Sequence, residues 1–246
     1  DHRDLHSFPT RRSSDLLVYT KNSEGTIVRS ESTEMLMEVI SKVWGMEMSA
    51  ASAGSGSPVM SLFASGSTGS MWEELLSGID GEPVCSVVKQ QYELAYGKWP
   101  ENFDETVLVL DEKNELSDIA LYALGLKTRD EVEEAISKAL TGKELDVDQR
   151  TWTYEEVCNR EFRLILNPDC YAPDESNSGA YKDLRDTDAG LRYLYNNGVP
   201  LKIVGIIRPS PDSISPMIRG TVAYTYKLTE YVSGRAGESA VAKAQL

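Results

Sequence analysis

Histidine is nearly missing from this sequence, because its two copies, His2 and His6, both lie within the first 16 residues. Those residues, DHRDLHSFPTRRSSDL, match one reading frame of a common sequencing adapter. We therefore interpret 1–16 as foreign sequence and expect the native protein to begin near residue 17. Residues 17–246 then contain no imidazole. This excludes Ser-His-Asp and Cys-His catalysis, His-ligated zinc and His-based proton transfer within them, since each needs such a group.

Long apolar runs and a phosphate-binding loop are also missing. The longest apolar runs, Thr106–Leu110 and Leu201–Ile207, are strand-sized, whereas a membrane-spanning helix needs roughly 20 residues. No lysine occurs between Lys42 and Lys89, so the Ser/Gly-rich stretch at about 49–70 lacks the GxxxxGK[ST] pattern of a P-loop. We interpret 49–70 as a flexible surface loop that buries too little apolar area to become ordered. The chain shows no means of hydrolysing ATP by itself.

Cysteine is scarce. Cys85, Cys158 and Cys170 are the only three, and no pair has the CxxC spacing. They can be buried thiols that behave as small apolar groups. Alternatively, Cys158 and Cys170 can form a disulfide outside the cell, but sequence spacing does not establish the geometry that a disulfide needs. The redox compartment therefore stays open at this point.

Positive charge is in deficit, with 25 Lys and Arg against 39 Asp and Glu and a formal net charge of −14. Nucleic acids and anionic membrane surfaces attract clustered basic residues, so neither is expected as a direct partner. The length of the chain is compatible with one large domain or two smaller ones.

Clustered acids allow two further interpretations. Asp111, Glu112 and Glu115 could act as a glycosidase pair, since two carboxylates can divide the acid and base roles, or they could form a solvated turn, which the DEKNE sequence favours. Acids in the stretch 169–188 could gather calcium, but they lack the spacing of an EF-hand loop. They are Asp169, Asp174, Glu175, Asp183, Asp186 and Asp188. We predict no metal and no cofactor.

Periodicity and turn residues predict an α+β fold with a mixed β-sheet and several helices, because the elements do not alternate strictly. Capping residues support the helices that follow Ser32 and Ser117. The predicted strands are the hairpin 17–30 and the segments 84–96, 105–111, 161–166 and 199–209. The predicted helices cover 32–44, 71–76, 117–125, 128–140, 153–157, 189–196, 224–231 and 238–246.

Three segments resemble the extracytoplasmic core domain of ABC transporter permeases of the MacB and FtsX type. Tyr92–Leu126 contains GKWP, ETVLV and DIALYALGL, where the family has G-[RK]-x-P, E-V-V-L-V and D-x-x-L-Y-x-L-G-L. Leu201–Val232 contains KIVGIIRP and GTVAYTYKLTEY, which are similar to K-V-V-G-I-I-R-P and G-x-x-x-Y-T-x-x-L-T-E-Y. Gly237–Leu246 looks like a family helix that stops midway. The three segments occur in the expected order and cover roughly a third of the chain.

This resemblance implies that residues 17–246 are part of a truncated, MacB-like extracytoplasmic domain. The domain would lie between the first and second transmembrane helices of a permease in the cell membrane. Its implied partners are a separate cytoplasmic ATPase subunit and a second permease subunit, and it is not itself an enzyme. The alternatives are a secreted or surface-anchored binding module, and an intracellular hydrolase that uses Asp111 and Glu115.

Three aromatic residues around the GKWP turn are the candidate binding residues. Tyr92, Tyr96 and Trp99 could form a surface for an apolar or peptide substrate or for a partner protein. Aromatic residues beside a turn can equally pack into the core. The two alternatives predict opposite exposures for these side chains.

Overall fold

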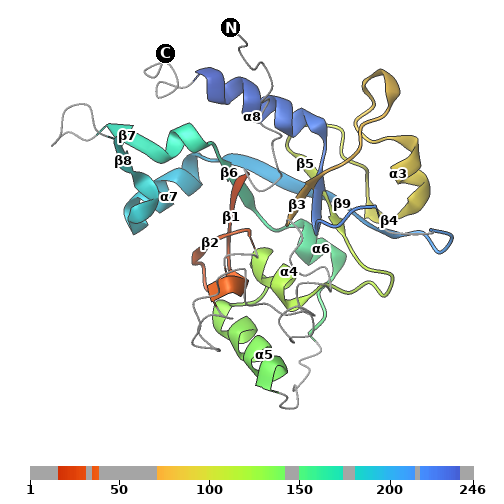
Figure 1. The fold of residues 1–246 in the computed structure, drawn as a ribbon, viewed down its shortest axis with the longest axis horizontal. Coiled ribbons are helices and arrows are strands. Elements are labelled where there is room, and N and C mark those ends of the chain that lie inside the picture. The colour runs from red at the N-terminus through yellow and green to blue at the C-terminus, as the bar shows by residue number, and fades with distance from the viewer. Residues whose placement is uncertain are drawn as a thin grey trace, which may run out of the picture.

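The computed structural model describes residues 16–31, 35–38, 71–141, 150–173, 181–213 and 217–238. They form an α+β fold, as predicted, with a curled mixed sheet and several helices (Figure 1). The main sheet has the order β2-β1-β6-β9-β5-β10-β3, with β4 also paired to β9, and β7 and β8 form a separate hairpin. The strands are β1 (Leu17–Lys21), β2 (Ile27–Arg29), β3 (Trp72–Glu74), β4 (Tyr92–Gly97), β5 (Glu105–Val109), β6 (Phe162–Ile165), β7 (Tyr171–Pro173), β8 (Tyr181–Asp183), β9 (Val199–Pro209) and β10 (Val222–Tyr224).

Strand β9 connects the two parts of the main sheet. Its first residues pair antiparallel with β6, with Leu201 opposite Phe162. Its later residues pair parallel with β5 and antiparallel with β4. The apolar run that predicted a strand at 199–209 is thus largely buried, because β9 has partner strands on both sides.

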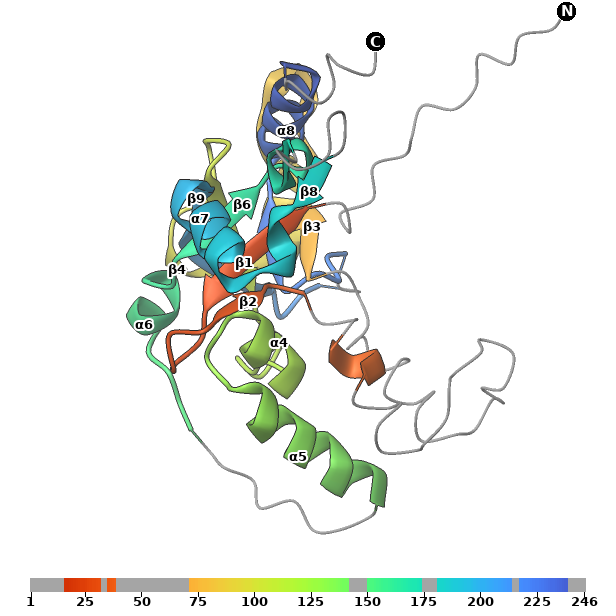
Figure 2. The ribbon, with the colours of Figure 1, turned by 90° about the vertical axis from the view of Figure 1, so that its left-hand side faces the viewer.

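Three of the helices begin at residues whose side chains cap them. The helices are α3 (Ser86–Gln91), α4 (Asp118–Ala123), α5 (Arg129–Thr141), α6 (Tyr154–Cys158), α7 (Asp188–Asn197) and α8 (Tyr226–Glu238), with 3-10 turns η3 (Ile79–Gly81), η4 (Asn167–Cys170) and η5 (Leu184–Asp186). The capped ones are α4, α6 and α7. The Ser117 side chain accepts the Ala120 N–H, which confirms this predicted N-cap. Thr153 forms a capping box with Glu156 that was not predicted, and Ser32 lies outside the described residues. Figure 2 shows α4 and α5 at the end of the molecule opposite α8.

Alternation along the strands divides the core between the two faces of the sheet. In β1, Val18 packs into the largest apolar cluster, while Leu17 and Tyr19 face the other way, toward Leu194 of α7. The same alternation separates Leu164 from Ile165 in β6. Because neighbouring residues of a strand point to opposite faces, helix α7 covers one face of this part of the sheet.

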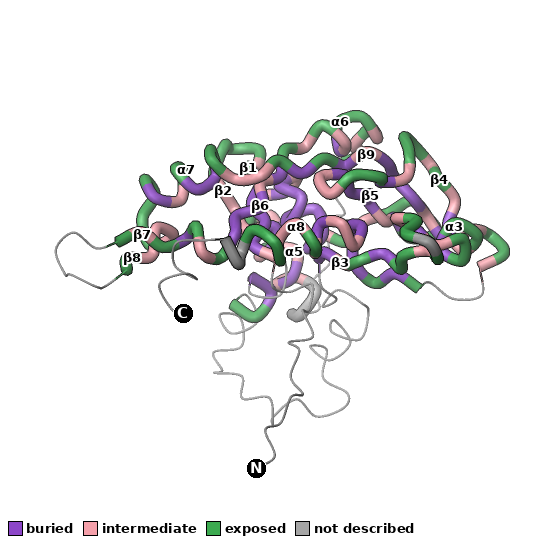
Figure 3. The backbone as a smooth tube through the Cα atoms, turned by 90° about the horizontal axis from the view of Figure 1, so that it is seen from above, coloured by how far each residue is buried: buried purple, intermediate pink, exposed green. Residues whose placement is uncertain are grey.

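The largest cluster joins strand residues to helices α4, α6 and α8. At its centre the rings of Trp72 and Phe162 meet edge to face, with their centroids 5.5 Å apart. Figure 3 shows the buried positions concentrated along the central strands. A third cluster packs α3 against β4, β5 and β9.

The predicted helix at 71–76 is wrong, because Trp72–Glu74 forms strand β3. This strand pairs parallel with β10, with Trp72 opposite Val222. The Trp72 side chain is buried, and its indole N–H donates to the carbonyl oxygen of Ser30 at 3.0 Å. Long-range pairing therefore overrides the helical preference of this short segment.

Two other predictions were right only in part. The predicted strand at 84–96 is helix α3 in its first half and strand β4 only from Tyr92, and the predicted helix at 224–231 is preceded by β10 and begins at Tyr226. The β7–β8 hairpin was not predicted. The loop at 49–70 and residues 1–15 lie outside the described residues, as do most of the helix at 32–44 and residues 239–246 of the last helix.

Candidate functional site

The three predicted aromatic residues do not share one surface. Tyr92 is only 2% exposed, and it belongs to the apolar cluster against which Trp99 packs. Tyr96 is 43% exposed and lies against the ring of Tyr154, with the centroids 5.8 Å apart. The core interpretation therefore holds for Tyr92 and Trp99, because strand β4 directs Tyr92 into the interior while Tyr96 stays at the surface.

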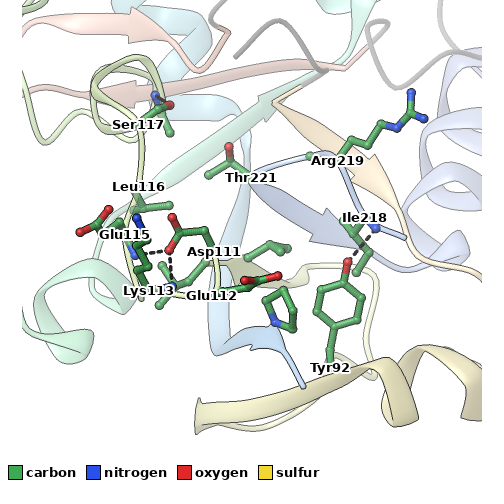
Figure 4. A pocket seen from close by; sticks show the side chains of 15 residues that line it. Tyr92, Asp111, Glu112, Lys113, Glu115, Leu116, Ser117, Ile218, Arg219 and Thr221 are labelled. Atoms are coloured by element: carbon green, nitrogen blue, oxygen red, sulfur yellow. Dashed lines mark hydrogen bonds between the residues drawn. The ribbon is translucent and has the colours of Figure 1, made fainter. Parts of the chain in front are cut away.

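A cleft of about 430 Å³ opens beside Tyr92, between the turn that follows β5 and the segment that precedes β10 (Figure 4). Both walls come from the segments that resemble the permease family. Its lining residues are Tyr92, Val109, Leu110, Asp111, Glu112, Lys113, Glu115, Leu116, Ser117, Ala120, Pro209, Ile218, Arg219, Gly220 and Thr221. Clefts of this size with convergent polar groups are the usual sites of ligand binding.

One wall of the cleft is a tight turn organised by Asp111. Its Oδ1 accepts the N–H groups of Lys113 at 2.9 Å and of Glu115 at 2.7 Å. Asn114 adopts a positive φ of 62°, a conformation that Asn tolerates better than most residues. These bonds make the solvated turn that the DEKNE sequence favoured.

The opposite wall is held by side chains from distant strands. The hydroxyl oxygen of Tyr92 accepts the Ile218 N–H at 2.8 Å. The Glu73 carboxylate accepts the N–H groups of Arg219 at 2.7 Å and of Gly220 at 2.5 Å. The backbone before β10 is therefore fixed by two side chains that lie more than 120 residues away in the sequence.

The possible glycosidase pair, Asp111 and Glu115, lies on the first wall. Two hydrogen bonds join these residues: the Glu115 N–H donates to the Asp111 carboxylate, and the Asp111 N–H donates to the Glu115 carbonyl oxygen at 3.3 Å. Both side chains are exposed. A carboxylate that organises its own turn already has a structural role, which the solvated-turn interpretation explains without catalysis.

The acidic stretch 169–188 is partly described. Asp183 pairs with Arg185, with the Arg185 Nη2 and Asp183 Oδ2 atoms 2.5 Å apart. Hydrogen bonding to that guanidinium lowers the pKa of the Asp183 carboxyl. Among the described residues no group of three or more acidic, His or Cys side chains could hold a metal ion, and 174–180 lie outside them.

The cysteines are free thiols. Cys170 is fully buried in the cluster beneath α7, whereas Cys158 ends α6 and packs against the largest cluster. The possible Cys158–Cys170 disulfide is therefore not formed. Burial raises the pKa of both thiols, as expected for cysteines that act as small apolar groups.

The GKWP turn is tied to the start of β5 by Glu105. This buried carboxylate forms an ion pair with Lys98 Nζ at 2.8 Å and accepts the N–H groups of Glu101 and Asn102. Burial alone would raise the pKa of Glu105, but the Lys98 ammonium and the two N–H groups outweigh it and lower the pKa to about 2. The turn is thus held by the Glu105 carboxylate, which must stay ionised to do so.

Glu105→Gln is expected to destabilise the protein by about 2 kcal/mol at neutral pH, after allowance for the exposed Lys98 end of the pair. A lowered pKa contributes stability that is complete above the ordinary value of 4.5 and is lost as pH falls toward about 2. The difference between wild type and variant should therefore shrink below about pH 4.5. Urea unfolding at a series of pH values measures it, with Glu24→Gln at an exposed turn as the control.

A difference between wild type and Glu105→Gln that stays constant down to the lowest pH at which the protein folds would contradict this account. A similar loss in Glu24→Gln would contradict it as well, because that side chain is exposed and is not part of the turn.

A second cleft, of about 450 Å³, lies between β6, the β7 strand and the C-terminal end of α7. Tyr171 and Tyr193 line it and are 40% and 61% exposed. Sequence analysis did not single out either residue, because the β7–β8 hairpin that places Tyr171 beside α7 was not predicted.

No protein-family model, curated protein or solved structure matches this chain. Within the described ranges, no helix has the length and apolar character that crossing a bilayer requires. The assignment of function therefore rests on the residues and their arrangement.

Proposed function

We propose that residues 17–246 are part of the extracytoplasmic domain of an ABC transporter permease of the MacB and FtsX type. In this role the domain couples a cytoplasmic ATPase subunit to substrate handling or to the transmission of motion outside the membrane. It lies on the extracytoplasmic side of the cell membrane, next to a second permease subunit, and makes or breaks no covalent bonds itself.

The observation that carries this proposal is that the two long family-like segments pack as one block. Tyr92–Leu126 provides β4, β5 and α4, and Leu201–Val232 provides most of β9, β10 and the start of α8. β4 and β5 both pair with β9, and β10 pairs with β5. Motifs that recur together in a family are expected to depend on each other in the fold.

Two glycines of the motifs approach each other closely within this block. Gly97, in the GKWP turn, and Gly205, in KIVGIIRP, are paired in the sheet. The N–H of Lys98 then donates to the carbonyl oxygen of Val204 at 3.0 Å. The close pairing of the two strands explains why each motif has a glycine at this position. This supports the interpretation that the motifs are parts of one domain type.

The native gene provides the first test. Its complete reading frame is expected to encode a transmembrane helix shortly before Leu17 and further helices after Leu246, with an ATPase gene next to it. A frame with a signal peptide and no later transmembrane helices would instead indicate a secreted or surface-anchored binding module. A frame with neither feature would overturn both assignments.

The side of the membrane provides the second test. A Glu24→Cys variant of the full-length protein, with Cys85, Cys158, Cys170 and any cysteine outside residues 17–246 replaced by Ala, presents one exposed thiol on the β1–β2 turn. A membrane-impermeant maleimide added to intact cells is expected to label it. Labelling only after lysis would place the domain inside the cell and contradict the proposal, and the Ala-substituted parent without the new cysteine is the control.

A further inference from the structure

Three basic side chains gather where β1 ends and β6 begins, although the chain as a whole is acidic. They are Lys21, Arg160 and Arg163. Arg163 pairs with Tyr19 across the two strands, and Lys21 lies two residues beyond Tyr19, so both point to the sheet face that α7 covers. The Arg160 guanidinium is held close by, since it donates to the carbonyl oxygens of Lys21 and Gly125. The fold thus concentrates positive charge at one edge of this face.

These cations have little negative charge to balance them. Among the described residues, neither Lys21 nor Arg160 forms an ion pair. Arg163 forms one, in which Nη2 lies 3.7 Å from an oxygen of Glu161, and the Glu161 side chain is 72% exposed. An ion pair at that distance and exposure contributes little. The cluster therefore attracts an anion from solution.

Two buried polar groups beside the cluster provide independent evidence for a ligand. Tyr195 of α7 is 2% exposed, and neither its hydroxyl nor Nε of Arg163 has a hydrogen-bond partner among the described residues. Burial and the charge of Glu161 raise the pKa of Tyr195, whereas the charges of Arg163 and Arg160 lower it, so the hydroxyl faces both guanidiniums. Buried polar groups without a partner cost free energy, and a ligand that provides acceptors removes this cost.

The donors converge from three elements of the fold. Lys21 Nζ lies 5.0 Å and Arg163 Cζ lies 5.9 Å from the centre of the Tyr195 ring. Ammonium and guanidinium groups can only donate, so the partner that they share must accept. A phosphate group has several acceptor oxygens and carries the charge that the cations lack, and arginine is a common phosphate ligand. The arrangement therefore fits a phosphate better than a neutral group.

We propose that Lys21, Arg163 and Tyr195 bind a phosphate group. The Tyr195 hydroxyl and the Arg163 Nε–H donate to its oxygens together with the Lys21 ammonium, and Arg160 adds positive charge. Lys21 is exposed, so the phosphate reaches the cluster from its side. This inference does not depend on the transporter proposal, since it concerns the chain alone.

Binding is tested by NMR titration of the full chain with inorganic phosphate, while sodium chloride holds the ionic strength constant. Saturable shifts are expected at the amides of 19–21, 160–163 and 193–197. Acetate, which has one negative charge and two oxygens, is the control anion and is expected to bind more weakly. Glycerol phosphate is titrated in the same way. Tighter binding of glycerol phosphate than of phosphate indicates that the site takes a phosphate ester, and weaker binding indicates the free ion.

Tyr195→Phe separates a ligand group from a structural one. Without phosphate this variant is expected to keep or slightly raise the thermal midpoint, because the lost hydroxyl has no partner within the described chain. Its affinity for phosphate is expected to fall about 5- to 10-fold, since one hydrogen bond to a charged group is lost. Tyr193→Phe changes an exposed tyrosine of the same helix and is the matched control, expected to alter neither quantity.

Two charge variants are expected to act in opposite directions. Arg163→Gln should weaken phosphate binding about 10-fold, because it removes a charge and a buried donor. Glu161→Gln should strengthen it about 2-fold, because the Glu161 carboxylate competes with the phosphate for Arg163. Arg192→Gln and Glu230→Gln make the same charge changes at exposed positions of α7 and α8, and are expected to leave the affinity unchanged.

Three results would overturn the proposal. They are shifts at these amides that do not saturate, acetate binding as tight as phosphate binding, and an affinity for phosphate that both Tyr195→Phe and Arg163→Gln leave unchanged. If Arg163→Gln does not fold, Lys21→Gln at an exposed position takes its place. None of these results bears on the membrane topology of the native gene, so failure here is distinguishable from failure of the transporter assignment.

Discussion

Gly97→Ala is expected to destabilise the protein by about 4 kcal/mol, because an unfavourable backbone conformation and a clash with backbone act together. Gly97 has a φ of +72°, which alanine adopts only at a cost. A Cβ at this position would also lie far closer than 3.0 Å to the carbonyl oxygen of Val204. Because the obstacle is backbone within β9, no side-chain rotation can relieve it.

Two further glycines separate the cost of the steric clash from the cost of the positive φ. Gly205→Ala keeps a negative φ but brings a Cβ against the carbonyl oxygen of Lys98, so it isolates the steric term, expected at about 3 kcal/mol. Gly25 has a φ of +80° with nothing within 4 Å, so Gly25→Ala isolates the backbone term, expected at about 1 kcal/mol. Denaturant unfolding followed by circular dichroism measures all three.

Equal losses in Gly97→Ala and Gly25→Ala would show that the turn does not approach β9 as closely as described. A loss in Gly97→Ala alone, with Gly205→Ala neutral, would mean that the strand can move away from the turn. Either result would also weaken the transporter proposal, because that proposal rests on the joint packing of these two motifs.

The sequence predicts the Gly-Lys-Trp-Pro turn, but it does not predict the contact that this turn makes with β9. Gly-Lys-Trp-Pro marks a turn by local chemistry, and Ser117 marks a helix start for the same reason. The approach of Gly97 to Gly205 is a contact across more than 100 residues, and nothing local encodes it. Elements governed by local hydrogen bonds were therefore predictable, whereas their packing was not.

Strand β3 and the cleft show the same limit. Trp72–Glu74 becomes a strand because β10 supplies its pairing partners, so the local helical preference predicted the wrong element. Glu73, the middle residue of this strand, holds one wall of the cleft. Its carboxylate accepts the N–H groups of Arg219 and Gly220, which lie 146 and 147 positions away in the sequence. Asp111 could be recognised as a turn residue from DEKNE, but the opposite wall could not.

The sequence left open whether Tyr92 lies on a binding surface or in the core. Substitution separates the stability that its ring contributes by packing from the stability that its hydroxyl contributes by hydrogen bonding. Tyr92→Ala is expected to cost about 3–5 kcal/mol, because it leaves a cavity between Val88, Ile207 and the residues around Ile218. Tyr92→Phe keeps the ring and removes only the acceptor of the Ile218 N–H, at an expected cost of about 1–2 kcal/mol.

Tyr96→Ala is the matched control, since it removes an exposed tyrosine from the same strand and is expected to change stability by less than about 1 kcal/mol. Denaturant unfolding measures the three costs, and hydrogen exchange at the Ile218 amide reports the lost bond directly. In Tyr92→Phe that amide should exchange faster while amides in β1 and β6 keep their protection, because only the cleft wall loses an anchor. Unchanged exchange at Ile218 would mean that the Glu73 carboxylate fixes this wall without the Tyr92 hydroxyl.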